Sequence, residues 1–194
     1  MKVIETAIPD LLIIEPRVFG DDRGFFMESW NAATFREAGL DLHFVQDNHS
    51  RSAKGVLRGL HFQTPTFAQA KLVRCVRGRI FDVAVDVRRG SPTYGRYVSA
   101  ELTADNGAQL YMPVGFAHAF MTLEPDTEVM YKVTAFYAPQ NDGGLRYDDP
   151  DIAVAWPLPA EQVVLSPKDA ELPLLRDFLS PFDYDGDPLT LTEL

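Results

Sequence analysis

The sequence has few features of a secreted, membrane-bound or nucleic-acid-binding protein. Its 194 residues include one cysteine, Cys75, so no intramolecular disulfide can form. Lys and Arg number 18 and Asp and Glu number 28, giving a net charge of −10. This charge argues against non-specific binding to nucleic acids or anionic membranes, although a locally basic pocket for a small anion remains compatible with it.

Long hydrophobic runs are also missing. No stretch approaches the length of a transmembrane helix, and the N-terminal MKVIETAIPD lacks the apolar core of a signal peptide. We therefore expect a cytoplasmic protein. The composition, 46% hydrophobic and 24% charged, is that of an ordinary globular chain, and the length favours one domain over residues 1–194.

Motifs for metals and cofactors are absent. No pair among the four histidines has the H-x-H spacing of a conventional β-barrel metal site, although histidines distant in sequence can still converge in space. Neither a Walker A loop nor a G-x-G-x-x-G element occurs. The sequence therefore predicts no metal site and no bound cofactor.

What the chain does contain is a strand pattern. Residues 79–88 read RIFDVAVDVR, in which four apolar side chains share one face while Asp82, Ala84 and Asp86 share the other. Further β-rich runs, separated by Gly, Pro, Asn and Asp clusters, cover residues 71–76, 95–102, 108–112, 117–123 and 128–137. Short strands at this spacing predict an all-β sandwich or barrel of the jelly-roll kind.

Few helices are expected. Asn31 to Ala38 fits one short helix, with Asn31 as N-cap and Gly39 as its stop. Ser166 and Pro167 have the residue types of a second helix start. The acidic residues 180–194 are expected to form a loose tail or a strap over the barrel.

Two segments concentrate polar side chains among apolar ones. Residues 46–63, QDNHSRSAKGVLRGLHFQ, place Arg58 and His61 beside leucines and a phenylalanine, and buried Arg and His need partners or a ligand. In residues 16–29, PRVFGDDRGFFMES, aromatic rings lie beside Arg23 in the sequence. Such rings can stack on a nucleobase, and the arginine can bind a phosphate. The structural alternative for the first segment is a solvated hairpin. For the second segment it is that the phenylalanines belong to the core or to a dimer interface.

Several motifs in order resemble the dTDP-4-dehydrorhamnose 3,5-epimerase family. The similarity spans about Pro16 to Asp169, and QDNHS followed by LRGLHFQ is its most specific part. The other motifs are PRVFGDDRGFFMES, AKLVRCVRGRIFDVAVDVRRGSPTYG, MPVGFAHAF, EVMYK, WP and LSPKD. The resemblance implies a homodimeric, cupin-type jelly-roll barrel without metal or cofactor, which inverts C3 and C5 of dTDP-4-dehydro-6-deoxy-D-glucose.

The resemblance also assigns roles to matching residues. His61 matches the catalytic base, Asp169 its carboxylate partner, and Tyr131 the acid on the opposite face. Lys71 matches a cation near the sugar oxygen, with Asp82 close by. Matches to substrate-binding positions are Gln46, Asn48, Arg58, His118, Phe136, Asp142 and Lys168. Matches to a nucleotide-binding segment supplied by the partner subunit are Phe19, Arg23, Phe26 and Glu28.

Three positions depart from the family's usual residues. Ala119 stands where Gly is usual, Tyr147 begins a Tyr-Asp-Asp in place of Trp-Asn-Asp, and Phe136 stands where a Tyr is usual beside the base. None of the three is the matched base or acid.

These residue types suit the implied reaction. A proton on the carbon next to a ketone is weakly acidic, so its removal needs a positioned base and stabilisation of the enolate oxygen, and inversion needs a proton donor on the other face. An imidazole oriented by a carboxylate, a Lys cation and a phenol supply these functions. The substrate's own carbonyl is the electron sink.

Each residue also has a structural alternative. His61 can be a core histidine bonded to backbone, and Asp169 can cap the helix that begins at Ser166. Tyr131 alternates with two valines and fits a core tyrosine, and Lys71 fits a charge at a strand end. For the whole chain the alternatives are an epimerase of C3 or C5 alone or a ketoisomerase, a non-catalytic nucleotide-sugar-binding jelly roll, and a metal-dependent cupin oxygenase.

Overall fold

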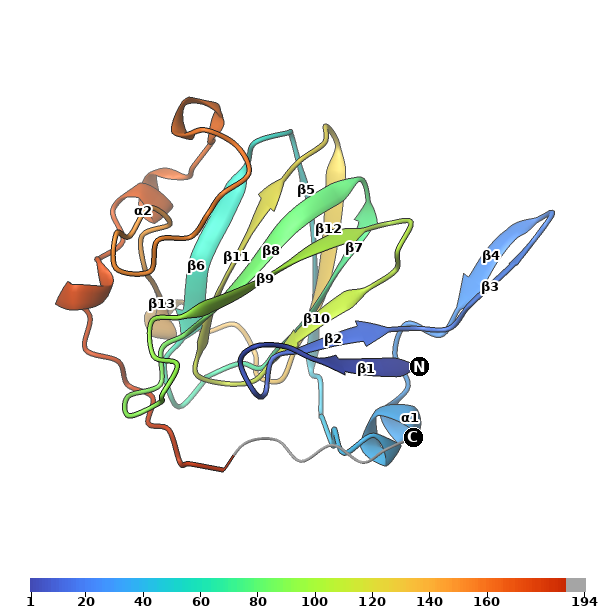
Figure 1. Ribbon diagram of the computed structural model, residues 1–194, viewed down its shortest axis with the longest axis horizontal. Coiled ribbons are helices and arrows are strands. Elements are labelled where there is room, and N and C mark those ends of the chain that lie inside the picture. The colour runs from blue at the N-terminus through green and yellow to red at the C-terminus, as the bar shows by residue number, and fades with distance from the viewer. Residues whose placement is uncertain (188–194) are drawn as a thin grey trace.

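A computed structural model describes residues 1–187, in which eleven strands form two antiparallel sheets that face each other (Figure 1). The six-stranded sheet has, in spatial order, β1 (Lys2–Glu5), β2 (Leu12–Glu15), β10 (Gln109–Met112), β7 (Lys71–Arg77), β12 (Thr127–Val133) and β5 (Gln46–Ser52). The five-stranded sheet has β13 (Asp142–Gly144), β6 (Leu57–Gln63), β11 (Phe116–Thr122), β8 (Arg79–Asp86) and β9 (Tyr97–Thr103). Neighbours in space are mostly distant in sequence, which is the topology of a jelly roll.

Apolar side chains fill three layers around these sheets. The central core lies between the sheets and includes Val73, Ile80, Leu110 and Phe120. Because successive side chains in a strand point to opposite faces, the same strands also bury residues on their outer faces. Val83 and Val85 of β8 share one face, as the alternation in residues 79–88 predicts, and the structure packs that face outward under the C-terminal segment.

The outer face of the six-stranded sheet is partly covered from the N-terminal side. Helix α1 (Ala32–Glu37) buries Phe35 against Leu12 and Leu72. Its N-cap is Asn31, whose side chain accepts from the backbone N–H groups of Ala33 and Thr34, as the sequence predicts.

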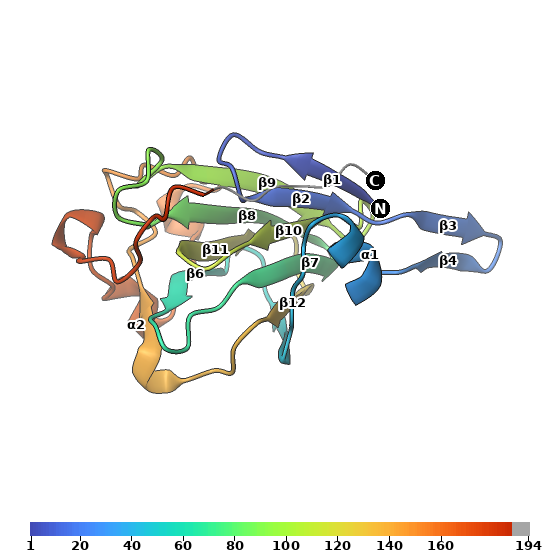
Figure 2. The same cartoon turned by 90° about the horizontal axis from the view of Figure 1, so that it is seen from below.

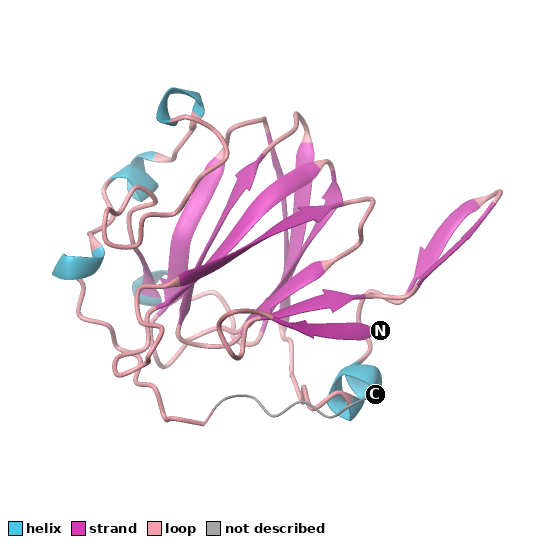
Figure 3. Ribbon diagram, viewed as in Figure 1, coloured by secondary structure: helices cyan, strands magenta, loops and turns pink. Residues whose placement is uncertain are grey.

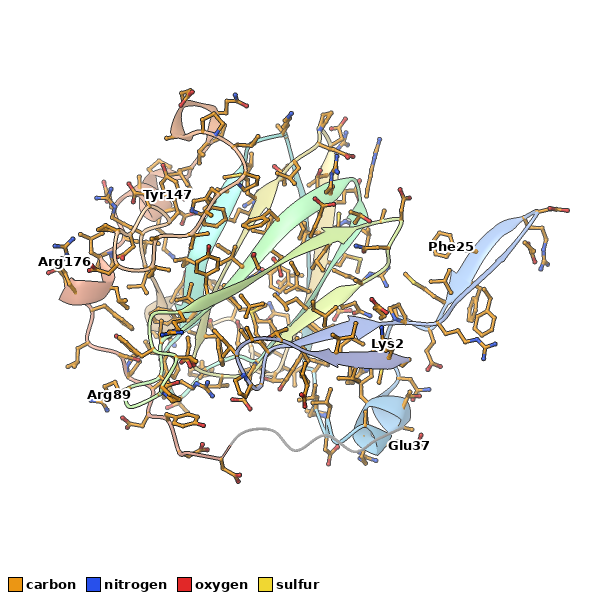
Figure 4. All side chains as sticks on the ribbon, in the orientation of Figure 1. Lys2, Phe25, Glu37, Arg89, Tyr147 and Arg176 are labelled. Atoms are coloured by element: carbon orange, nitrogen blue, oxygen red, sulfur yellow. The ribbon has the colours of Figure 1, made fainter. Side chains whose placement is uncertain are left out.

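A β-hairpin of β3 (Val18–Asp21) and β4 (Gly24–Met27) projects away from both sheets (Figures 1 and 2). Figure 4 shows Phe25 on this arm, well away from the body. The side chains of Phe19, Phe25 and Phe26 are at least half exposed, at 50%, 66% and 70%. Such a cluster of exposed aromatics on one small element is typical of a surface that another molecule covers.

The chain beyond β13 has little regular structure and crosses the outer face of the five-stranded sheet (Figure 3). It contains 3₁₀ turns at Ala160–Gln162 and Leu175–Asp177 and the short helix α2 (Pro167–Ala170), and a further 3₁₀ turn at Pro139–Asn141 precedes β13. The Ser166 hydroxyl accepts from the Asp169 backbone N–H, which confirms the predicted helix start. The C-terminal part of this segment runs beside Arg89. The backbone of Arg89 hydrogen-bonds to Phe182 and Tyr184, and its side chain forms an ion pair with Asp183.

The all-β jelly-roll prediction is confirmed, and most predicted strands occur within a few residues of their expected bounds. The expected strand over 128–137 ends early, at Val133. The polar segment 46–63 is not a hairpin, because β5 and β6 lie in different sheets. Residues 188–194, part of the predicted domain and of the predicted tail or strap, lie outside the described residues. Among residues 1–187, no helix is long and apolar enough to cross a membrane.

Candidate active site

His61 and Asp169 form a hydrogen-bonded pair at one end of the space between the sheets. His61 lies on β6, and its Nε2 is 2.7 Å from Asp169 Oδ1 on helix α2. The Asp169 side chain is 5% exposed and that of His61 is 31% exposed, so the carboxylate is buried behind the imidazole. An imidazole that donates its Nε2–H to this carboxylate keeps its lone pair on Nδ1, where it can accept a proton.

Asp169 is stabilised as an anion by its surroundings. Burial favours a raised pKa for this carboxyl, but hydrogen bonds from His61, the Gly59 backbone and Ser166 lower its pKa below the usual value. Asp169 therefore belongs both to the helix cap and to the pair with His61. Its backbone N–H donates to the Ser166 hydroxyl, while its carboxylate binds His61.

Gly59 allows β6 to pass close to β11 at this point. Its φ is +127°, and a Cβ built there would lie 2.4 Å from Ala119 Cβ and 2.5 Å from His118 O. A side chain at position 59 would displace the neighbouring strand, which itself carries His118. The glycine of LRGLHFQ is thus required by a steric contact at the site.

A second histidine–aspartate pair lies deeper, on the same sheet. His118 Nε2 on β11 is 2.8 Å from Asp82 Oδ1 on β8, and the two side chains are 6% and 0% exposed. Burial lowers the pKa of His118 and raises that of Asp82, although each partner opposes the other's shift. The other carboxylate oxygen of Asp82 is buried with no hydrogen-bond partner among the described residues.

Lys71 brings a buried cation to this cluster from the facing sheet. It lies on β7, is 7% exposed, and its Nζ donates to the His61 backbone carbonyl at 3.2 Å. Burial lowers the pKa of Lys71 to about 8, and the negative charges of Asp82 and Asp142 oppose that shift. Lys71 is therefore mostly protonated at neutral pH and is not a simple strand-end charge.

Tyr131 faces the histidines from β12 of the six-stranded sheet. Its ring centroid lies 6.5 Å from that of His118. Burial raises the pKa of its hydroxyl above the ordinary value, Arg58 lowers it and Asp142 raises it. The phenol therefore keeps its proton at neutral pH, as an acid must.

All of these side chains except that of Asp82 line an open cavity of about 390 Å³. Its charged and polar lining comprises Ser50, Arg58, His61, Lys71, His118, Tyr131, Ser166, Lys168 and Asp169. A smaller hollow of about 140 Å³ shares His61, Lys71 and Tyr131 with it and adds Gln46, Asn48, Gln63, Gln69, Tyr137 and Asp142. Arg58 is exposed at the surface of the cavity, where its guanidinium donates to the Ser52 hydroxyl.

Most of the residues expected at the site thus come together, and five do not. Phe19, Arg23, Phe26 and Glu28 lie on or beside the projecting arm and are exposed. Phe136 is 62% exposed and lines neither hollow, because the next residue, Tyr137, points to the cavity instead. The prediction of Phe136 beside the base is therefore corrected to Tyr137.

Sequence reasoning missed Ser50 and Tyr137 at the site and assigned no role to Gln63. Strand alternation predicts Ser50, since it shares a face of β5 with Gln46 and Asn48. Its hydroxyl is buried without a hydrogen-bond partner among the described residues. Tyr137 carries no local signal, because it follows the end of β12.

The arrangement suits proton transfer to and from carbon. A carboxylate-oriented imidazole and a protonated phenol stand on facing sheets, with a buried ammonium beside the imidazole. In the part of the chain that the structure describes, no group of three or more His, Cys, Asp or Glu side chains could hold a metal ion.

A jelly-roll barrel whose cavity holds an acid–base pair of this kind defines the class of an isomerase that moves protons at carbon. The chain matches the family described as dTDP-4-dehydrorhamnose 3,5-epimerase over residues 5–177. A relative of that name from Salmonella typhimurium is 54% identical over 180 residues, covering 92% of this chain and 98% of the relative. The chain belongs to the dTDP-4-dehydrorhamnose 3,5-epimerase family.

Solved structures support the same assignment. A 3,5-epimerase from Legionella pneumophila, in complex with dTDP-4-keto-L-rhamnose, is 49% identical with a TM-score of 0.87, covering 90% of this chain and 93% of that one. A 3′-monoepimerase from Streptomyces bikiniensis, in complex with dTDP-quinovose, is 36% identical with a TM-score of 0.83, covering 88% and 86%. The sequence identity to the 3,5-epimerase is therefore higher than that to the 3′-monoepimerase.

Proposed function

We propose that this enzyme inverts C3 and C5 of dTDP-4-dehydro-6-deoxy-D-glucose to give dTDP-4-dehydro-L-rhamnose, with His61 as base and Tyr131 as acid. The observation that carries the proposal is that the hydrogen-bonded His61–Asp169 pair and Tyr131 line one cavity from facing sheets. A sugar ring between the sheets then meets a base on one face and an acid on the other.

Each inversion proceeds in two proton transfers. His61 takes the proton from C3, and the electron pair of the broken C–H bond forms a C3–C4 double bond and a negative charge on the C4 oxygen. Lys71 stabilises that charge as a buried cation. Tyr131 then gives its proton to C3 on the opposite face, the carbonyl re-forms, and both side chains regain their original protonation states by exchange with water. C5 flanks the same carbonyl and reacts in the same way.

Asp169 supports the base throughout. It holds the imidazole in the tautomer with Nε2–H and stabilises the imidazolium that forms during the transfer. His118 of the deeper pair adds a buried polar side chain to the cavity wall, and the negative charge of Asp82 favours the protonated form of Lys71.

The diphosphate and nucleoside need cations and aromatic rings outside the sugar cavity. Arg58 at the cavity surface suits the diphosphate, because a guanidinium fork matches phosphate oxygens. Gln46, Asn48, Asp142 and Lys168 complete the polar binding wall. The arm with Phe19, Arg23, Phe26 and Glu28 lines neither of the two hollows at the site, and we propose that it completes the site of a second copy in a homodimer. The cytoplasmic location stays a prediction.

Inversion at C3 alone is the second candidate, because the similar protein from Streptomyces bikiniensis is a 3′-monoepimerase. One experiment tests both. The enzyme is incubated with dTDP-4-dehydro-6-deoxy-D-glucose in heavy water, and NMR follows deuterium and configuration at each carbon. Deuterium with inversion at C3 and C5 supports the proposal, inversion at C3 alone supports the second candidate, and binding without exchange excludes both.

A further inference from the structure

The chain that follows β12 is held by side chains instead of by a neighbouring strand. After Val133 it leaves the sheet, and four consecutive residues use backbone groups to bond to three glutamine side chains, which we call the glutamine cradle. These bonds are Gln69 Nε2 to Ala135 O at 2.7 Å, Gln63 Nε2 to Phe136 O at 3.1 Å, Tyr137 N to Gln46 Oε1 at 3.0 Å and Ala138 N to Gln63 Oε1 at 2.7 Å. The cradle satisfies backbone groups that a sheet would otherwise pair.

Gln63 is the central member of the cradle. It is 3% exposed and uses both ends of its amide, since its Nε2 also donates to Phe67 O at 2.7 Å. Two carbonyl partners at the NH₂ end and one N–H partner at the oxygen end allow only one orientation of the amide. The side chain therefore holds the residues on both sides of Tyr137 and, in addition, the loop that contains Phe67.

What the cradle positions is one wall of the cavity. The Tyr137 side chain is half exposed, lines the hollow shared with His61 and Tyr131, and donates its hydroxyl to Asp142 Oδ2. The same Asp142 oxygen accepts from Lys168. Tyr137, Asp142 and Lys168 thus form a continuous polar wall between the loop after β12 and helix α2.

We infer that Gln63 is a positioning residue for substrate binding, acting through Tyr137. The inference rests on the proposed function, because the wall matters only if the sugar nucleotide occupies this cavity. Gln63 is bonded to the residues on both sides of Tyr137, so its loss removes two of the four cradle bonds and loosens the loop, while the His61–Asp169 bond does not involve Gln63. Substrate binding then weakens more than proton transfer.

A purely structural role makes a different prediction. A buried amide with three backbone partners also contributes to folding stability, so a fall in melting temperature alone does not separate the two roles. Coupling to Tyr137 does separate them, because only a residue that acts through Tyr137 loses its effect on binding once the Tyr137 ring is removed.

The experiment is a double-mutant cycle on the full-length enzyme. Gln63→Met, Tyr137→Ala and the double variant are assayed for kcat and KM with dTDP-4-dehydro-6-deoxy-D-glucose. Gln63→Met is expected to raise KM about tenfold and to change kcat by less than about threefold. In the Tyr137→Ala background, the same substitution is expected to change KM by less than about twofold.

Asp149→Asn is the matched control. Asp149 is 1% exposed and likewise bonds three backbone groups, the N–H groups of Asp151, Ile152 and Leu175, but it does not line the cavity. It is expected to lower the melting temperature without changing KM. If Gln63→Met does not fold, Gln63→Asn, whose amide is one methylene too short to reach all its partners, enters the same cycle.

The inference is overturned if a folded Gln63 variant has an unchanged KM, or if the Gln63 substitution changes KM equally with and without the Tyr137 ring. In either case the proposed function stands as long as the wild-type enzyme inverts the sugar. A wild-type enzyme that does not invert the sugar overturns both.

Discussion

His61 and Asp169 are separated by 108 positions in the sequence, yet their side chains meet at 2.7 Å. The base lies on a strand of the five-stranded sheet, and its partner lies on a short helix of the segment that covers that sheet's outer face. The relationship depends on the packing of that segment, and it allows two functions of Asp169 to be separated experimentally.

Asp169→Asn removes the negative charge beside the imidazole while leaving the helix cap intact. We expect deuterium exchange at C3 to slow by about 10²–10⁴-fold, because the imidazole loses its orienting anion. Heavy-water NMR gives the rate. Ser166→Ala removes the cap and a hydrogen bond to the carboxyl but keeps the negative charge, and it is the control: if it slows exchange as much as Asp169→Asn does, helix placement and not the charge of the carboxylate is responsible.

His61→Asn and Tyr131→Phe are expected to fail in different ways. Without the base no enolate forms, so His61→Asn abolishes deuterium incorporation. Tyr131→Phe keeps the base, so exchange with the original configuration continues while inversion falls by about 10²–10⁴-fold. Wild-type exchange in the first variant would place the base elsewhere, and normal inversion in the second would make Tyr131 a core tyrosine.

The pH dependence of the reaction should report Lys71. Its pKa is lowered to about 8, so the cation is present below pH 8 and is lost as the pH rises. We expect kcat/KM to fall above about pH 8, where the raised pKa of Tyr131 still keeps that phenol protonated. Lys71→Arg retains a charge throughout this range, so any activity it keeps should show no such fall. A wild-type profile that is flat through pH 8 would contradict this role.

Complementation tests whether the arm serves a second copy. The Arg23→Ala/Phe26→Ala double variant has a damaged arm, and His61→Asn has a damaged cavity; each alone should be nearly inactive. Mixed and allowed to exchange subunits, they should regain about a quarter of wild-type activity, because half of the dimers are mixed and each has one intact site. Two inactive variants that stay inactive when mixed, or a fully active monomer, would contradict the shared site.

Metal removal provides a further test. The scattered histidines predict an enzyme that keeps full activity in EDTA. Elemental analysis of the purified protein and assay after dialysis against chelator check this. A stoichiometric transition metal whose removal abolishes activity would favour the oxygenase-like alternative.

Local rules determined much of this fold from the sequence alone. The alternation in residues 79–88 put Val83 and Ala84 on opposite faces, and the caps at Asn31 and Ser166 started helices where expected. These features depend on neighbouring residues, which the sequence displays directly. The family resemblance supplied the candidate acid and base, which no spacing in the chain singles out.

The tertiary structure decided the rest. Thr134, Phe136 and Tyr137 are residue types that favour strands, yet the chain leaves the sheet after Val133. The glutamine cradle bonds the backbone of the residues that follow, and Tyr137 instead of Phe136 lines the cavity. The burial that lowers the pKa of Lys71, the close passage of β11 at Gly59 and the meeting of His61 with Asp169 all arise between segments far apart in sequence. Local propensity contains no information on such contacts, since they exist only once the two sheets and the covering segment have packed.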